Sequence, residues 1–230
     1  NVPNTDWLEV YYDGRETSSY SGTGTTVNDL AGTQQNGTFN GGFDPTYKAF
    51  TFNGTSQNMT TTLANSGTPS AYAHTFAFWT KPISNLANHT QQAFLQLGTH
   101  SANSCSALRL EESTGNFRWF FHTNDIRYSA DHIILGEWNH IVAAYDGGSE
   151  LTSRRIWVNG YEIHHIASET PGALSLSANA PLSIGSLNGG NTYFNGSIAN
   201  FRLYSKALNA DQVKELYDYQ KDYFLGSKSQ

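Results

Sequence analysis

Residues 138–165, WNHIVAAYDGGSELTSRRIWVNGYEIHH, contain the pattern that decides the fold class. Asn159-Gly160 separates RRIWV from YEIHH, two short runs that contain β-branched and aromatic residues. Asn-Gly favours a two-residue type I′ turn because both residues tolerate positive φ, so the pair predicts a tight β-hairpin. A further β-type run begins at Trp138 and ends at an Asp-Gly turn. The whole stretch therefore predicts antiparallel strands joined by short turns.

The same succession of β-type runs and turn signals extends along most of the chain. Asn-Gly pairs begin at Asn36, Asn40, Asn53, Asn159, Asn188 and Asn195, and Asp-Gly pairs begin at Asp13 and Asp146. Clear β-type runs occupy residues 48–54, 74–82, 93–98, 107–112, 116–123, 138–147, 154–160, 181–186 and 196–205. Many short strands at this spacing indicate an all-β protein, a two-sheet antiparallel β-sandwich or jelly roll.

One segment near the C-terminus follows helical spacing instead. In residues 209–220, NADQVKELYDYQ, Asn209 and Gln212 have the spacing of a capping box, and apolar residues follow at helical intervals. The pattern predicts one short helix that packs on the sandwich. No boundary signal interrupts residues 1–220, which we expect to form one domain, and we interpret residues 221–230 as the start of a linker to a downstream region.

The composition excludes several classes of protein. The 230 residues include 13 Lys+Arg and 19 Asp+Glu, which gives a net charge of −6, and 13% of them are aromatic. A nucleic-acid groove needs clustered basic residues, which this sequence lacks, and the aromatic content argues against disorder. No apolar stretch reaches the roughly 18 residues of a membrane span, so neither nucleic acid nor membrane insertion is expected. The single Cys105 excludes an internal disulfide and is expected to be a small, partly buried side chain.

Several stretches of the chain carry a more specific pattern in a fixed order. They are LEVYYDGRETSSYSGTGTTVNDLAGTQQNGT at 8–38, HTFAFWTKP at 74–82, GEWNHIVAAYDG at 136–147, RIWVNG at 155–160, PLSIGS at 181–186 and YFNGSIANFRLYSKALNADQVKELY at 193–217. Together they resemble laminin G-like domains of the concanavalin A-like lectin/glucanase superfamily. The resemblance implies a jelly roll of two antiparallel sheets with six or seven strands, one sheet concave and one convex.

The resemblance also implies a role and a location. Domains with this N-terminal pattern occur in modular surface proteins, including bacterial secreted proteins, phage fibres and structural proteins of large algal viruses. We therefore expect a non-catalytic module that binds glycans or a glycoprotein surface, within a longer extracellular or virion-surface chain. The alternative is a structural or protein-interaction module of a capsid or fibre that has no small ligand.

Glycoside hydrolases share this fold and form a second alternative. Retaining glycosidases need two carboxylates about 5–5.5 Å apart, which members of the family place on one strand at alternate positions. Glu111 and Glu112 are adjacent and would point to opposite faces of a strand, whereas Glu9 and Asp13 fall on an expected edge strand and turn. The sequence therefore favours a protein that is not an enzyme, although distant residues could still assemble a catalytic site.

The densest set of residues suited to sugar binding lies in 116–131, NFRWFFHTNDIRYSAD. Aromatic faces with Asn, Asp and Arg side chains are typical of carbohydrate sites. Period-two alternation places Phe117 and Trp119 on one face of the strand and Arg118 and His122 on the other, so Trp119 could instead fill the core. The predicted ligand-binding residues are Arg109, Arg118, Trp119, His122, Asn124, Asp125, Arg127 and Tyr128, with Asn188 and Tyr193 from a second loop.

Metal sites are only partly indicated by the sequence. His164 and His165 are adjacent and would point to opposite faces of a strand, so they do not favour zinc. The family resemblance implies one structural Ca2+ near the meeting of the first and last strands, with Asp13, Asn53 and Asn200 supplying oxygen ligands. The alternative is that Asp13 belongs only to a turn and that Asn200 is an ordinary strand residue.

Overall fold

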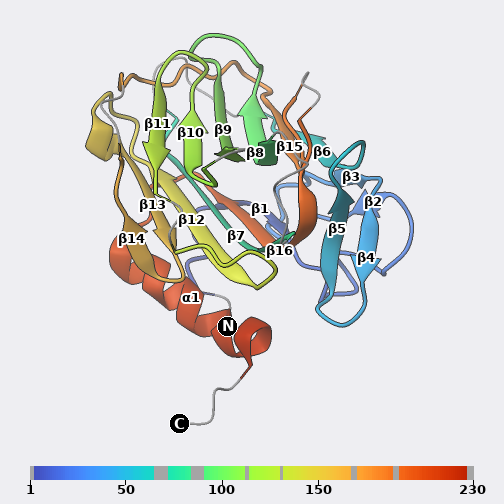
Figure 1. Cartoon of the computed structure of the whole chain (residues 1–230). Coiled ribbons are helices and arrows are strands. Elements are labelled where there is room, and N and C mark those ends of the chain that lie inside the picture. The colour runs from blue at the N-terminus through green and yellow to red at the C-terminus, as the bar shows by residue number, and fades with distance from the viewer. Residues whose placement is uncertain are drawn as a thin grey trace.

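Two antiparallel β-sheets pack against each other, and one α-helix lies against the outer surface of one of them (Figure 1). The computed structural model describes residues 3–64, 72–83, 91–111, 114–129, 132–166, 170–188 and 192–226. Strands make up 43% of the described residues. The all-β jelly-roll sandwich with a single C-terminal helix is therefore confirmed.

The first sheet carries the helix. Its strand order is β14-β13-β12-β7-β16-β5-β4, and β1 also pairs with β16. In that order the bounds are Tyr161–Ile163, Arg154–Val158, Asn139–Tyr145, His74–Pro82, Asn195–Tyr204, Ala49–Asn53 and Gly42–Asp44, with β1 at Leu8–Tyr12. A short 3-10 helix, η1 (Leu151–Ser153), precedes β13. The long strands β7 and β16 lie at the centre of this sheet. The last strand, β16, pairs with β7, β5 and β1, which all lie within the first 82 residues.

The second sheet has the order β11-β10-β9-β8-β15-β6-β3-β2. In that order the bounds are Asp125–Tyr128, Phe117–Phe120, Cys105–Glu111, Gln91–Gly98, Pro181–Ile184, Met59–Thr62, Gly37–Phe39 and Thr26–Val27. The described residues thus give each sheet eight strands rather than six or seven. Strands β2, β3 and β4 account for part of the difference, since segments of two or three residues show no detectable periodicity.

The hairpin predicted at Asn159-Gly160 is confirmed between β13 and β14. The two residues adopt φ values of 52° and 83°, and the register pairs Val158 with Tyr161 directly across the turn. A Cβ atom on Gly160 would lie 3.2 Å from the Tyr217 ring of the helix. Glycine therefore serves both the positive φ of the turn and the close approach of the helix.

Aromatic side chains from both sheets fill the space between them. Phe78 on β7 packs against Phe94 on β8 and Phe201 on β16, with ring centroids 5.5 and 6.3 Å away. The predicted alternation in β10 is also confirmed, because Phe117 and Trp119 are fully buried while Arg118 between them faces away from the core. Recognition must therefore use the outer faces of the sheets or their loops.

Helix α1 (Ala210–Leu225) covers part of the outer face of the first sheet. Asn209 and Gln212 exchange side-chain to backbone hydrogen bonds of 3.0 Å each, which confirms the predicted capping box. In the described ranges, no helix is long and apolar enough to cross a membrane.

The helix extends further than the sequence predicts. It ends at Leu225 rather than Gln220, because Phe224 stacks on Trp79 of β7 with ring centroids 4.5 Å apart. The Trp79 Nε1 group also donates to Gln220 Oε1 over 3.0 Å. The predicted end of the helix is therefore wrong, and residues 221–225 belong to the packed structure.

Candidate functional site

Three arginines lie side by side on the outer face of the second sheet. The register pairs Arg118 on β10 with Arg109 on β9 and with Arg127 on β11. Their neighbours along each strand are buried in the core, so period-two alternation turns the three side chains outward. Adjacent strands are about 4.8 Å apart, so the three positions span roughly 10 Å. We call Arg109, Arg118 and Arg127 the arginine row.

Two carboxylates pair with part of the arginine row. Arg118 Nε donates to Asp125 Oδ2 over 3.1 Å, and Arg127 Nε donates to Glu111 Oε1 over 3.0 Å. Arg118 Nη1 also lies 3.7 Å from Glu111 Oε1, so one guanidinium group contacts both carboxylates. These four side chains are between 18% and 35% exposed, which leaves them accessible to a ligand while reducing the screening of their charges by water.

Arg109 differs from the other two arginines in its partners. Its Nη1 donates to Gln91 Oε1 over 2.5 Å, and its Cζ lies 5.1 Å from the centroid of the Phe120 ring. Its Nε is buried and makes no hydrogen bond. Burial, aided by the positive charge of Arg118, lowers the pKa of Arg109 below its ordinary value. Within the described part of the chain, Arg109 has no carboxylate partner at ion-pair distance.

Phe120 belongs to a small apolar cluster on the same outer face. It packs with Ala93, Cys105, Ala107 and Leu187, all of which are buried. Burial raises the pKa of the Cys105 thiol to about 12, which keeps the thiol protonated and unreactive. The expectation that Cys105 is a small structural side chain is therefore confirmed, and its burial is complete rather than partial.

Two histidines border this cluster. The rings of His100 and His122 have centroids 4.4 Å apart, and the His100 ring lies 6.0 Å from the Phe120 ring. Burial lowers the pKa of His100, and electrostatic interactions with His122 and Arg109 lower it further. The predicted ligand-binding residue His122 is thus an exposed side chain near one end of the arginine row.

Two predicted ligand-binding residues do not reach this surface. Trp119 is fully buried and donates from Nε1 to Ser106 Oγ over 2.9 Å. Tyr128 is 2% exposed, and its hydroxyl donates to the Arg154 carbonyl over 2.7 Å. Both residues alternate with arginines along their strands, so they point into the core when the arginines point out. The prediction that Trp119 and Tyr128 contact a ligand is therefore wrong.

The other predicted residues lie around the arginine row to different extents. Asp125 is part of it through Arg118, whereas Asn124 is half-buried and bonds through its side-chain amide to Asn103 in a neighbouring turn. Asn188 donates to the Gly98 carbonyl over 3.2 Å, and Tyr193 is half-buried at the end of the same loop. Residues 130–131 and 189–191, which complete the two predicted segments, lie outside the described residues.

Asn188 belongs to a different part of the outer face. A polar hollow of about 390 Å³ lies farther along the second sheet, lined by threonines of β3 and β6 and by Asn188. Leu187, next in the chain, packs with Phe120 instead. The loop therefore separates two polar regions of the face, and only the arginine row carries opposing charges.

Sequence reasoning missed Gln91, His100 and Glu111. Glu111 was considered only as half of a catalytic pair, yet it lies two residues after Arg109 and so shares its face of the strand. Gln91 is brought next to Glu111 by the pairing of β8 with β9, which no local pattern reveals. His100 lies in the turn between the same strands. Only Glu111 could have been found from alternation along its own strand.

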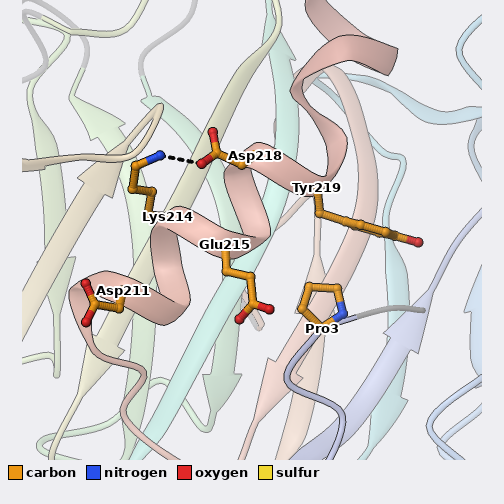
Figure 2. A pocket seen from close by; sticks show the side chains of 6 residues that line it. All are labelled: Pro3, Asp211, Lys214, Glu215, Asp218 and Tyr219. Carbon is orange, nitrogen blue, oxygen red and sulfur yellow. Dashed lines mark hydrogen bonds and ion pairs between the residues drawn. The ribbon is translucent and has the colours of Figure 1, made fainter.

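In a second hollow, formed by helix α1 and the N-terminal segment, the charged side chains point in different directions. It is lined by Pro3, Asp211, Lys214, Glu215, Asp218 and Tyr219. Figure 2 shows Lys214 reaching to Asp218 on one side of the helix, while Glu215 extends on another side toward Pro3. The carboxylates therefore do not converge on a common point, and this hollow is a weaker candidate than the arginine row.

The proposed calcium ligand Asp13 already has a cationic partner. Its Oδ2 atom accepts hydrogen bonds from Arg15 Nη2 at 2.6 Å, Asn200 Nδ2 at 2.7 Å and the Tyr11 hydroxyl at 2.8 Å. Burial alone would raise the pKa of Asp13, but the hydrogen bonds and charge of Arg15 hold it below its ordinary value. The Arg15 guanidinium group thus supplies the positive charge that a cation would supply.

The three predicted calcium ligands do not form one site. Asn53 pairs with Asn195 at the start of β16, whereas Asp13 contacts Asn200 in the middle of that strand. The Asn53 side-chain oxygen accepts backbone N–H groups of its own turn, and Asn200 offers its NH2 group to Asp13. Across the described ranges, no group of three His, Cys, Asp or Glu side chains could hold a metal ion. The residues therefore do not fit the expected Ca2+.

Comparisons with solved structures find the same fold in larger proteins. One match is a sialidase from Trypanosoma rangeli in complex with sialic acid, with 16% identity and a TM-score of 0.64 over 96% of this chain and 34% of that chain. Domain 4 of an extracellular arabinanase from Geobacillus stearothermophilus, in complex with arabinotriose, has 21% identity and a TM-score of 0.58 over 92% and 98% of the two chains. The binding domain of botulinum neurotoxin serotype D has 15% identity and a TM-score of 0.65 over 94% and 51%.

These similarities show the fold alone, and the chain spans about a third of the length of the sialidase that it matches. A search of curated proteins finds no match. The model of one protein family, described as the concanavalin A-like lectin/glucanases superfamily, matches residues 52–214. That match covers more than half of the sequence and agrees with the two-sheet architecture. The chain belongs to the concanavalin A-like lectin/glucanase superfamily.

Proposed function

We propose that the chain is a non-catalytic module that binds carbohydrate on the outer face of the second sheet, around the arginine row. The observation that carries the proposal is a set of planar hydrogen-bonding groups fixed at adjacent strand positions. Arg118 and Arg127 are held by Asp125 and Glu111, and all four side chains are partly exposed. Paired donors and acceptors of this kind suit the neighbouring hydroxyl groups of a sugar ring.

The ion pairs also favour binding by restricting motion before the ligand arrives. When a ligand immobilises a free arginine side chain, the lost conformational entropy costs about 0.5–1.5 kcal/mol of binding free energy. Arg118 is already held by two carboxylates and Arg127 by one, so much of this cost is met in the folded protein. Each hydrogen bond from a charged group contributes about 1.5–3 kcal/mol, so two or three such contacts would support binding in the millimolar to micromolar range.

The comparisons support a role in recognition. The arabinanase domain is similar over nearly its whole length and was solved with arabinotriose. The sialidase and the neurotoxin are larger chains, of which this fold forms only a part. A recognition module within a larger protein is consistent with both observations.

One observation favours a second candidate, glycoside hydrolysis. Glu111 and Asp125 flank the same guanidinium group of Arg118, so two carboxylates do approach each other on an accessible face. A glycosidase needs one carboxylic acid and one carboxylate on either side of the scissile bond. Here Arg118 occupies the space between the two groups, which supports binding over catalysis.

A glycan array followed by calorimetric titration tests the proposal. We expect the native protein to bind at least one class of oligosaccharide and Arg118→Gln to bind it more weakly. Arg155→Gln is the matched control, because Arg155 pairs with Glu162 on the first sheet, away from the proposed site. Absence of any saccharide binding would contradict the proposal. Release of shortened products that stops in Glu111→Gln would support the glycosidase instead.

A further inference from the structure

The arginine row is not uniform, and the difference bears on the chemistry of the ligand. Arg118 and Arg127 donate to carboxylates, whereas Arg109 donates to the neutral amide of Gln91. A guanidinium group removed from water without a counter-ion carries a desolvation cost that a neutral hydroxyl group offsets only in part. The unmatched charge therefore lies next to two arginines whose charges are already matched.

We infer that the saccharide bound at this face carries a carboxylate or sulfate group, and that Arg109 receives this anion. The inference rests on the proposed function, and it names the class of sugar that the same site takes. An anion placed beside Arg109 would supply the ion-pair partner that the described residues do not provide. A planar carboxylate, or two oxygens of a sulfate, matches the fork of a guanidinium group.

The geometry of Arg109 prepares it for this role. Its Nη1 group is held by Gln91 at 2.5 Å, and its guanidinium carbon lies 5.1 Å from the centre of the Phe120 ring. These two contacts restrict the plane of the group from two directions. The buried Nε has no hydrogen-bond partner, and burial lowers the pKa of Arg109 although the charges of Glu111 and Asp125 act in the opposite direction.

The nearby carboxylates are each paired with another arginine, which weakens their repulsion of an anion at this position. Glu111 accepts from Arg127 and lies 3.7 Å from Arg118, and Asp125 accepts from Arg118. Each negative charge is therefore already paired with a guanidinium group. His122, an exposed ring near the same end of the face, adds no negative charge.

Calorimetric titration with defined oligosaccharides tests the inference. The probes are trigalacturonate for the carboxylate, a chondroitin sulfate tetrasaccharide for the sulfate, and galactotriose and arabinotriose as neutral sugars. We expect at least one acidic probe to bind about tenfold or more tightly than the neutral ones, which corresponds to one charge-assisted hydrogen bond. Raising NaCl from about 50 mM to about 500 mM should weaken acidic binding because the Debye length shortens.

Variants locate the anion. Arg109→Gln should weaken the affinity for acidic probes by about tenfold or more and leave the affinity for neutral sugars unchanged. Arg109→Lys keeps the positive charge, so its affinity for acidic probes should fall by less. Arg155→Gln on the first sheet should bind as the native protein does. If Arg109→Gln does not fold, the preference for acidic probes and the salt dependence of the native protein decide the matter.

The outcomes separate this inference from the proposed function. Equal binding of neutral and acidic probes, weakened by Arg118→Gln but not by Arg109→Gln, would overturn the acidic specificity and leave carbohydrate recognition standing. Absence of binding to all four probes and across the glycan array would overturn both. Preference for the sulfated over the carboxylated probe, or the reverse, would identify which anion the site accepts.

Discussion

Replacing Arg15 by alanine removes the positive charge beside a buried carboxylate. Asp13 is 1% exposed, and Arg15 contacts both of its oxygens through Nε, Nη2 and its own backbone N–H group. After Arg15→Ala, the charge of Asp13 would still be buried, with only neutral donors from Tyr11, Asn200 and the backbone. The native state should therefore lose stability without losing any part of the apolar core.

The size of this loss of stability follows from the burial of the Asp13–Arg15 ion pair. Removing one partner of a fully buried ion pair costs about 3–5 kcal/mol. The Arg15 side chain is 23% exposed, and Asp13 keeps three other donors, so both the desolvation and the unmet hydrogen bonding are smaller than in that case. We expect a loss of about 2–3 kcal/mol in the free energy of unfolding. For a domain of this size, that loss lowers Tm by roughly 4–12 °C.

Urea unfolding followed by tryptophan fluorescence measures the change. Arg155→Ala is the control, because its ion pair with Glu162 is 43% and 32% exposed and should contribute less than about 1 kcal/mol. The folded-state pKa of Asp13 is held below its unfolded value, so the stabilisation is present above about pH 4 and is lost as pH falls through the folded pKa. The difference in the free energy of unfolding between the native protein and Arg15→Ala should therefore become smaller at acidic pH.

Two results would refute this reasoning. A loss below about 0.5 kcal/mol would mean that the neutral donors alone satisfy Asp13. If Arg15→Ala cost the same free energy of unfolding in the native background and in an Asp13→Asn background, Arg15 would not act through Asp13. Chelation with EDTA should leave the Tm of the native protein unchanged, since Arg15 supplies the charge expected from Ca2+.

Three further changes test the packing of the core and of the helix. Trp119→Phe should lower the free energy of unfolding by about 2 kcal/mol, because the hydrogen bond to Ser106 is lost. It should leave saccharide affinity unchanged, and loss of binding in a folded variant would contradict the core position of Trp119. Phe224→Ala should cost about 3 kcal/mol in urea unfolding because it removes the stack on Trp79, and a neutral effect would mean that the end of α1 is not needed. Burial lowers the folded-state pKa of His140 to about 3, below its unfolded value, so its contribution to stability is present above about pH 6.5 and falls by about 1.4 kcal/mol per unit as pH drops toward 3. The free energy of unfolding should fall less steeply between pH 6.5 and 5 in His140→Phe, and an unchanged slope would show that this histidine is not the group responsible.

Local patterns in the sequence predicted most of the secondary structure. Each of the nine β-type runs overlaps a strand, and the run at 74–82 matches β7 at both ends. The turn at Asn159-Gly160 and the capping box at Asn209 were also found, because both depend on residues within four positions of each other. The short strands β2, β3 and β4 escaped detection, since their pairing with neighbours rather than their own composition makes them strands.

The candidate site was only partly accessible to the same reasoning. Alternation along β10 separated Arg118 from Trp119 correctly, but the sequence did not say which of the two faces meets the core. Arg109 and Arg118 are adjacent because of the register between β9 and β10, which depends on pairing across a turn. Glu111 and Gln91 join the site by the same long-range pairing.

The sequence by itself determined the fold class, most of the strands, the start of the helix and the arginine-rich segment, because these follow from interactions between residues close along the chain. Only the tertiary structure decided that three arginines form one row, that Trp119 lies in the core and that Arg15 supplies the charge beside Asp13. The contact between Asp13 and Asn200 joins the first strand to the last. Such contacts depend on strand register and on which face is buried, and these are set by the packing of the whole sandwich rather than by local propensity.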